Sequence, residues 1–287
     1  MADFYNHYTT EFNQNWLTRI QQMPSKLAQY ISTEEFDGEK KRYDRMNTVA
    51  VQERTMRNGP TPTQNVSTDS RWAKRKSFDI PAHLIDRDEA QNLGALTLPN
   101  SELIKQHGFA YNRKFDQQVL RTALGAVWTG TDGETSTAFS ATYQIAHGSA
   151  SLTIAKILQA KEIMDTAEVD EQSSPIMVVH PKQITSLLNI TEAKSADYNT
   201  VKALAEGKVD TFCGFKFITS TQVAVSSTTY SCVAFHPSAL RITRGGLVTS
   251  IKERADLSDS MQLYSYFRLA GTRVHDEAVI QIDCQNS

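Results

Sequence analysis

The sequence contains few cysteines and no long apolar run, and both shortages exclude classes of protein. Its three cysteines, Cys213, Cys232 and Cys284, lie far apart and form no CxxC pair. This spacing favours free, partly buried thiols over a disulfide framework or a zinc-binding pair. No window reaches the roughly 18 uninterrupted apolar residues that a membrane-spanning helix needs, and the mixed polar start is unlike an export signal. We therefore expect a soluble protein made in the cytoplasm, without a membrane partner.

The sequence also lacks an excess of charge of one sign. Its 287 residues include 30 basic and 32 acidic side chains, which give a formal net charge of −2. No global positive field is therefore present to condense nucleic acid. Basic residues are nevertheless concentrated between positions 40 and 76, where ten of them stand against Asp44, Glu53 and Asp69.

Enzyme motifs are missing as well. The segment nearest to a GxSxG nucleophile elbow, at 148–151, lacks the second glycine, and the segment nearest to a phosphate loop, at 125–131, has threonine in place of lysine. The seven histidines form no HxxxH or HExxH pair. His180 and His236 each follow a predicted strand and precede a proline, so we expect them to cap helix starts. We assign no catalytic, cofactor-binding or metal-binding residue; a metal site built from remote residues is the alternative.

The first half of the chain predicts an arm, a hairpin and a long helix. Apolar residues at helical spacing over 3–31 predict an amphipathic arm, which either folds back on its own core or lies on a neighbouring subunit. Extended segments at 43–53 and 72–80 surround the turn-rich 58–65. Residues 100–127 predict a helix of roughly 40 Å, and a polar loop follows at 129–151.

The second half alternates helix and strand before it ends in strands. The periodicity predicts helices at 151–169, 182–188 and 201–205 and strands at 175–179, 212–218, 231–235, 247–253, 261–269 and 278–283. Turns are expected at Gly245–Gly246 and at Gly271. The predicted fold class is α+β.

The C-terminal third carries a family resemblance. Its segments are SADYN at 195–199, KALAEGKVDTFCGFKFI at 202–218, CVAFHPSAL at 232–240 and the tail at 253–284. These segments resemble those of the major capsid proteins of tailed double-stranded-DNA phages, the group with the HK97-type fold. The motifs are similar over about 150–284, and the remainder is similar in layout.

The resemblance implies a division of the chain and a function. It implies an N-terminal arm at 1–35, an extended hairpin (E-loop) at 36–82, a peripheral domain with the spine helix at 83–149, an axial domain at 150–240 and peripheral strands at 241–287. It further implies a virion protein that assembles with itself into pentamers and hexamers, forming an icosahedral shell that encloses DNA without sequence-specific binding. The segment before the hairpin is too short for a large built-in scaffold, so we expect a separate scaffolding protein, with a portal and a decoration protein as further partners.

Two other functions stay open at this point. A bacterial nanocompartment shell has the same fold but encloses enzymes, and an enzyme with a site made from scattered residues is the other class.

The basic stretch supports one site hypothesis. We expect Arg54, Arg57, Lys74 and Arg75 to dock the hairpin on an acidic surface of the next subunit. The alternatives are a solvated face or linker and, since Trp72 lies among basic residues, a single-strand nucleic-acid contact.

Overall fold

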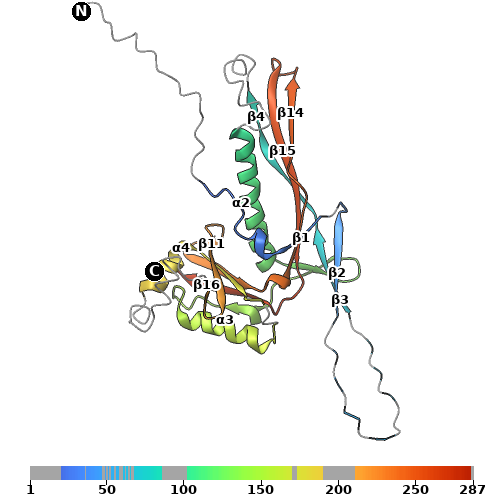
Figure 1. Cartoon of the computed structure of the whole chain (residues 1–287), viewed down its shortest axis with the longest axis vertical. Helices are drawn as coiled ribbons and strands as arrows, with labels where there is room; N and C mark the ends of the chain where they lie inside the picture. The colour runs from blue at the N-terminus through green and yellow to red at the C-terminus, as the bar shows by residue number, and fades with distance from the viewer. Residues whose placement is uncertain are drawn as a thin grey trace, which may run out of the picture.

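The computed structural model describes residues 21–35, 37–46, 68–85, 102–169, 173–189 and 211–285, together with scattered positions between 49 and 65. Within these residues the chain is a mixed α+β structure with three sheets. Figure 1 shows an elongated upper part and a compact lower part. The helix expected at 201–205 and most of the N-terminal arm lie outside the described residues.

The upper part is a five-stranded sheet with one long helix against it. The strands are β1 (Ser32–Glu34), β4 (Lys76–Ile85), β13 (Leu240–Arg244), β14 (Val248–Arg254) and β15 (Ser260–Arg273). They run in the order β1-β13-β15-β14, with β4 also paired to β15, and only β1 pairs in parallel. In β4, Pro81 stands where the register with β15 shifts, a position that suits a residue without an N–H group.

Helix α2 (Glu102–Leu124) is the predicted spine. Its buried residues Phe115, Val119, Leu120 and Ala123 belong to the same apolar cluster as residues of both larger sheets, because they recur at three- and four-residue steps on one face. Tyr111 meets the ring of Phe267 edge-on at 4.9 Å between centroids. The predicted 100–127 helix thus exists with a slightly shorter extent.

Gly271 contradicts one expectation, because it lies inside β15 and not in a turn. A Cβ atom at this position would lie 2.5 Å from Thr122 Oγ1 and 2.7 Å from Ile242 Cδ1. The glycine therefore allows α2 to approach the sheet closely. The other expected turn, at Gly245–Gly246, does separate two strands, β13 and β14.

The lower part is a seven-stranded sheet between two apolar clusters. Its strands are β7 (Gln144–Ile145), β8 (Ile176–Val179), β9 (Thr211–Phe212), β10 (Phe215–Thr219), β11 (Ala224–Ser226), β12 (Thr229–Phe235) and β16 (Val279–Gln285). They follow the order β7-β16-β12-β8-β10-β9, with β11 on β12. All four residues of β8 are buried, with Ile176 and Val178 in the cluster that includes α2 and Met177 and Val179 in the other. This is why β8 reads as an unbroken apolar run.

Helices α3 (Ile154–Thr166) and α4 (Pro181–Asn189) belong to the lower part, where α3 lies along its base (Figure 1). Helix α3 begins after Thr153, whose hydroxyl accepts a hydrogen bond from the Lys156 amide. Ile157, Ala160 and Met164 pack into the second apolar cluster.

The projecting hairpin starts from a small four-stranded sheet. It contains β2 (Lys40–Met46), β3 (Thr68–Lys74), β5 (Val127–Thr129) and β6 (Thr135–Thr137) in that order. The expected second hairpin strand is divided, because β3 ends at Lys74 and β4 continues into the five-stranded sheet. The segment 129–151, expected to be a plain loop, contains the last residue of β5, all of β6, a 3₁₀ turn η4 (Ala141–Tyr143) and β7.

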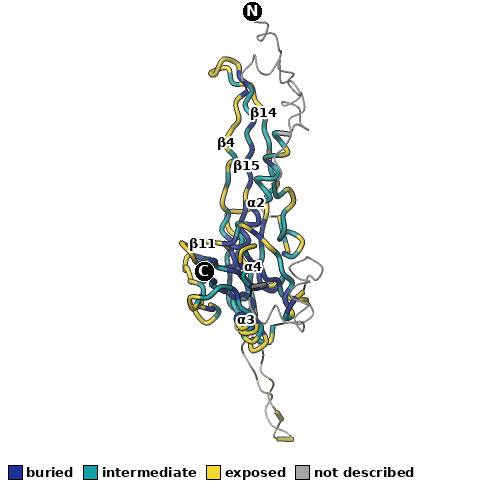
Figure 2. Tube along the Cα trace, turned by 90° about the vertical axis from the view of Figure 1, so that its left-hand side faces the viewer, coloured by how far each residue is buried: buried dark blue, intermediate teal, exposed yellow. Residues whose placement is uncertain are grey.

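Residues 21–31 contain a 3₁₀ turn, η2 (Ala28–Tyr30), and not the helix expected there. Buried residues follow β15 through the upper part and gather in the lower part, while the described positions of the projecting loop are exposed (Figure 2).

Candidate assembly surfaces

The base of the hairpin uses its basic residues within the chain. Lys40 and Lys74 face each other across β2 and β3, and both approach Glu134 after β5, with Nζ–Oε distances of 2.5 and 3.8 Å. The hydrogen bond from Lys40 and the charges of both lysines lower the pKa of Glu134. Lys74 Nζ also lies 3.4 Å from the centroid of the Trp128 ring. The alternating pattern of β2 thus places its first lysine over the β5–β6 turn.

Arg75 is likewise engaged at the base. Its guanidinium donates to the Asp37 carbonyl at 2.6 Å, and its amide donates to the Glu39 carbonyl at 3.0 Å. Two of the four residues assigned to docking, Lys74 and Arg75, therefore hold the hairpin to its own chain.

A second ion network joins the hairpin to the segment after β15. Arg71 of β3 bonds Asp276 at 2.7 Å, and Arg273 bonds the same carboxylate at 2.5 Å. Arg273 is 1% exposed and also donates to the carbonyls of Ala123 and Gly125 at the end of α2. Asp276 and these carbonyls offset the cost of burying that charge.

Arg45 of β2 extends this network to Glu277, with an Nη1–Oε2 distance of 3.4 Å. A hydrogen bond from His275, together with the Arg45 charge, lowers the pKa of Glu277 to about 2, against the opposing effect of burial. Sequence reasoning did not find this network, because the pairs that join the hairpin to it, Arg45–Glu277 and Arg71–Asp276, are more than 200 residues apart along the chain and carry no motif.

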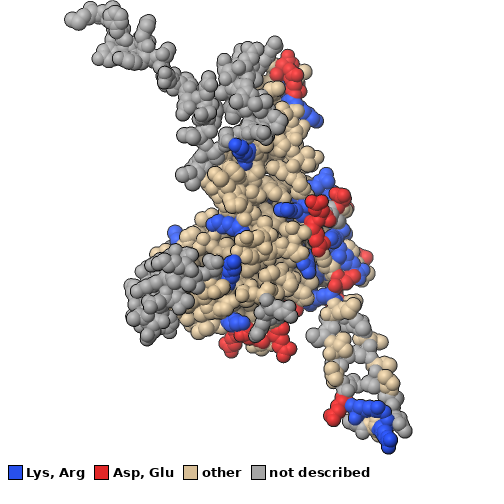
Figure 3. Space-filling model, viewed as in Figure 1, with Lys and Arg blue, Asp and Glu red and all other residues tan. Residues whose placement is uncertain are grey.

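The tip of the hairpin is different. Arg54 donates to the carbonyls of Met56 and Arg57, and no ion pair is formed by Arg54 or Arg57 within the described part of the chain. Val51 and Met56 are 98% and 68% exposed. Figure 3 shows basic side chains gathered at the end of the projecting loop. The structure thus separates the four predicted residues into a base pair and a tip pair.

Two acidic surfaces lie elsewhere on the subunit. One is the tip between β14 and β15, where Glu253, Asp256 and Asp259 are exposed and Asp256 is paired with Arg254. The other follows the second half of α3, where Glu162, Asp165 and Glu168 are exposed and Asp165 is paired with Lys161. Figure 3 shows acidic side chains at the upper end of the molecule and along the lower body.

The two histidines singled out in the sequence cap helix starts, as predicted. His180 Nδ1 accepts from the Lys182 amide at 3.2 Å at the start of α4, and His236 Nδ1 accepts from the Ser238 amide at 3.3 Å. His236 Nε2 lies 2.6 Å from Ser173 Oγ. In the tautomer whose Nδ1 accepts the Ser238 amide hydrogen bond, Nε2 carries the ring proton and donates to the serine, which fits a structural cap.

The three cysteines are free, as predicted, with Cys232 and Cys284 buried and Cys213 half-buried. In the ranges the structure describes, no three side chains of the metal-ligating types come together. None of the described helices is long and apolar enough to cross a membrane.

Comparisons with known proteins agree with this structure. A family model described as phage capsid protein matches residues 5–286. No curated protein matches the sequence.

Several solved structures share the fold over the full chain. The capsid of Ralstonia phage GP4 is 14% identical, with a TM-score of 0.72 over 100% of this chain and 98% of that chain. A structure titled Mycobacterium phage Che8 is 16% identical, with a TM-score of 0.69 over 97% and 98%. The capsid asymmetric unit of cyanophage Pam1 is 11% identical, with a TM-score of 0.68 over 99% of each chain.

At these identities the structural likeness establishes the fold, which confirms the predicted α+β, HK97-type class. The match of the family model establishes the rest. The chain belongs to the family of phage capsid proteins: it is a major capsid protein, a homo-oligomeric subunit of the icosahedral shell of a phage, and not an enzyme.

Proposed function

We propose that the hairpin tip, through Arg54 and Arg57, joins each capsid subunit to an acidic surface of the next copy. The observation that carries this proposal is the contrast in partners: the basic residues of the hairpin base form ion pairs, whereas Arg54 and Arg57 form none with the residues that the structure describes. Exposed Val51 and Met56 give the same tip apolar area to bury. A contact between two different surfaces of identical chains can close into rings, as pentamers and hexamers require.

The experiment uses two matched double variants of the full chain. Arg54→Glu with Arg57→Glu should leave the melting temperature of the unassembled subunit unchanged and abolish shells in electron micrographs. Arg54→Lys with Arg57→Lys keeps the charge and should still assemble. Normal shells from the glutamate variant would overturn the docking role.

Lys74 and Arg75 are expected to act on the stability of the subunit and not on docking. Lys74→Glu would place a carboxylate beside Glu134 and remove the contact with Trp128, so its first effect should be lower subunit stability. The original set of four thus divides into two residues that dock and two that hold the base.

We propose a domain division that follows the sheets. The peripheral domain would contain α2 and the five-stranded sheet, and the axial domain would contain the seven-stranded sheet with α3 and α4. Strand β16 pairs with β12, which supports placing 279–285 with the axial domain, although 241–287 was expected to be peripheral throughout. The hairpin and its small sheet form the third unit.

We also propose that the shell encloses double-stranded DNA without binding it tightly, with a separate scaffolding protein, a portal and a decoration protein as partners. The net charge of −2 supports a passive wall. Nuclease-protected DNA in purified particles would support this content. A protein cargo in place of DNA would contradict it and favour a nanocompartment.

A further inference from the structure

A polar segment crosses the junction between the two larger sheets. Residues 21–34, here called the strap, run from the side of α2 through η2 to β1, which lies parallel to β13 (Figure 1). Leu27 is 0% exposed and Ile31 is 6% exposed, so two apolar residues fix it in the core. Ala28 and Tyr30 pack partly against the same cluster, and polar contacts supply the rest of the hold on the strap.

Asp116 of α2 makes more of these polar contacts than any other described side chain. The residue is completely buried, and its carboxylate accepts four hydrogen bonds. All four donors belong to the strap: Gln22 Nε2 and Ser25 Oγ at 2.5 Å, the Lys26 amide at 3.0 Å and the Leu27 amide at 3.3 Å. No ion pair with Asp116 is formed in the described part of the chain. A buried carboxylate is costly without such donors, so Asp116 and the strap depend on each other.

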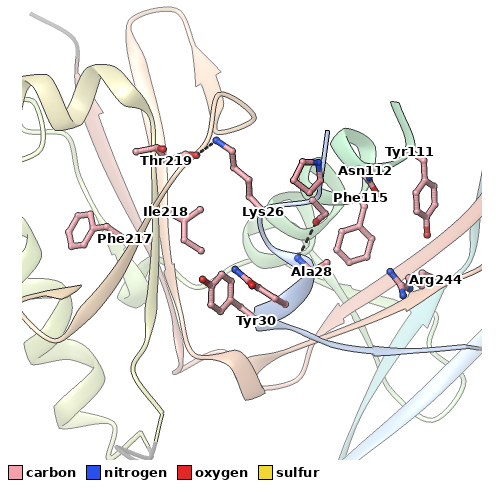
Figure 4. A pocket seen from close by; sticks show the side chains of 13 residues that line it. Lys26, Ala28, Tyr30, Tyr111, Asn112, Phe115, Phe217, Ile218, Thr219 and Arg244 are labelled. Carbon is pink, nitrogen blue, oxygen red and sulfur yellow. Dashed lines mark hydrogen bonds between the residues drawn. The ribbon is translucent and has the colours of Figure 1, made fainter. Parts of the chain in front are cut away.

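The strap also reaches the seven-stranded sheet. Lys26 Nζ donates to the Thr219 carbonyl at the end of β10 at 2.7 Å, and the Lys216 ammonium lies 4.9 Å from the centroid of the Tyr30 ring. Beside these contacts is a hollow of about 710 Å³ between the strap, α2 and β10, rimmed by Arg244 (Figure 4). On this side of the junction, α2 and β10 are therefore separated by open space and connected through the strap.

We propose that Asp116 is a positioning residue for assembly. By holding the strap, it fixes how the seven-stranded sheet sits against α2 on the side of the hollow. Subunits with a fixed angle between the two parts build a shell of one curvature, and subunits in which this angle varies build shells of several diameters. This role is independent of docking by the hairpin tip.

The first test is Asp116→Asn, which keeps the shape but replaces one acceptor oxygen with a donor amide. Hydrogen exchange of the Lys26 and Leu27 amides in unassembled subunits should accelerate by about tenfold or more, since hydrogen bonds to a charged group are lost. Shells of this variant should show a broadened diameter distribution in micrographs. Glu39→Gln is the control and should change neither readout, because Glu39 is exposed before β2 and, among the described residues, only its backbone carbonyl accepts a hydrogen bond.

The second test removes only the connection to β10. Lys26→Met should broaden the shell diameters while exchange at the Leu27 amide stays at the wild-type rate, and it carries the test if Asp116→Asn does not fold. Unchanged exchange in Asp116→Asn would show that the carboxylate does not hold the strap. Uniform, wild-type diameters from both variants would overturn the role in assembly.

Discussion

The base and the tip of the hairpin contain the same kinds of residue and have opposite surroundings. At the base, Arg71 is 5% exposed and pairs with Asp276, and Lys40 and Lys74 share Glu134. At the tip, Arg54 and Arg57 reach only backbone carbonyls or solvent within the described residues, beside a valine that is 98% exposed. The difference teaches that the basic residues of this stretch fall into two groups, one engaged within the subunit and one without ion-pair partners among the described residues. Charges at the base stabilise the subunit, and charges at the tip are available to another molecule.

The largest expected effect comes from replacing Arg273, the buried arginine in the ion network that joins the hairpin base to the segment after β15. Arg273→Met would leave Asp276 with Arg71 alone and the Ala123 and Gly125 carbonyls without their donor. Removing one partner of a buried ion pair costs about 3–5 kcal/mol, and urea unfolding of the unassembled subunit measures it.

The control for this change lies on the same strand. Arg268 is exposed on β15, so Arg268→Met should alter the free energy of unfolding by no more than about 0.5 kcal/mol. Equal losses from the two variants would show that the buried network does not stabilise the base.

Acid should weaken the base to a smaller extent, through Glu277. Its folded-state pKa of about 2 lies below the ordinary 4.5, so its contribution is complete above about pH 4.5 and is lost as the pH falls toward 2. Because the side chain is 36% exposed, solvent screening reduces this contribution to about 1 kcal/mol.

The measurement compares wild type with Glu277→Gln. The difference in their free energies of unfolding should shrink by about 1 kcal/mol between pH 6 and pH 2.5. Arg45→Met should reduce that pH dependence, since Arg45 is one of the groups that lower the pKa. A difference that stays constant over this range would contradict the assignment.

Local patterns predicted the elements that depend on local physics. The 3.6-residue period identified α2, and the unbroken apolar run at 176–179 identified β8. The histidine–proline pairs predicted two caps, because a cap involves neighbours in sequence.

The rest depends on contacts that no local pattern encodes. A glycine at position 271 predicts a turn, and only the close approach of Thr122 and Ile242 explains why it lies inside a strand. Asp116 and Arg273 are ordinary charged residues in sequence. The donors to Asp116 lie about 90 residues away, and the carbonyls to which Arg273 donates lie about 150 residues away. The pair proposed to dock differs again, since Arg54 and Arg57 are distinguished by the ion-pair partners that they lack among the described residues.

The smallest expected effect on the subunit comes from changing the apolar part of the tip. Val51→Ser with Met56→Ser removes apolar area that contacts little within the chain, so the free energy of unfolding should stay within about 0.5 kcal/mol of wild type. If the tip buries these side chains against the next copy, full burial of each is worth about 1.5–3 kcal/mol. The threshold concentration for shell formation, read by light scattering, should then rise by at least about tenfold.

The control for this change is Leu84→Ser. Leu84 is 52% exposed on β4, away from the tip, so its replacement should leave the threshold concentration unchanged. If the tip variant leaves the threshold concentration unchanged, the tip docks by charge alone. That result would contradict the burial of Val51 and Met56 against the next copy.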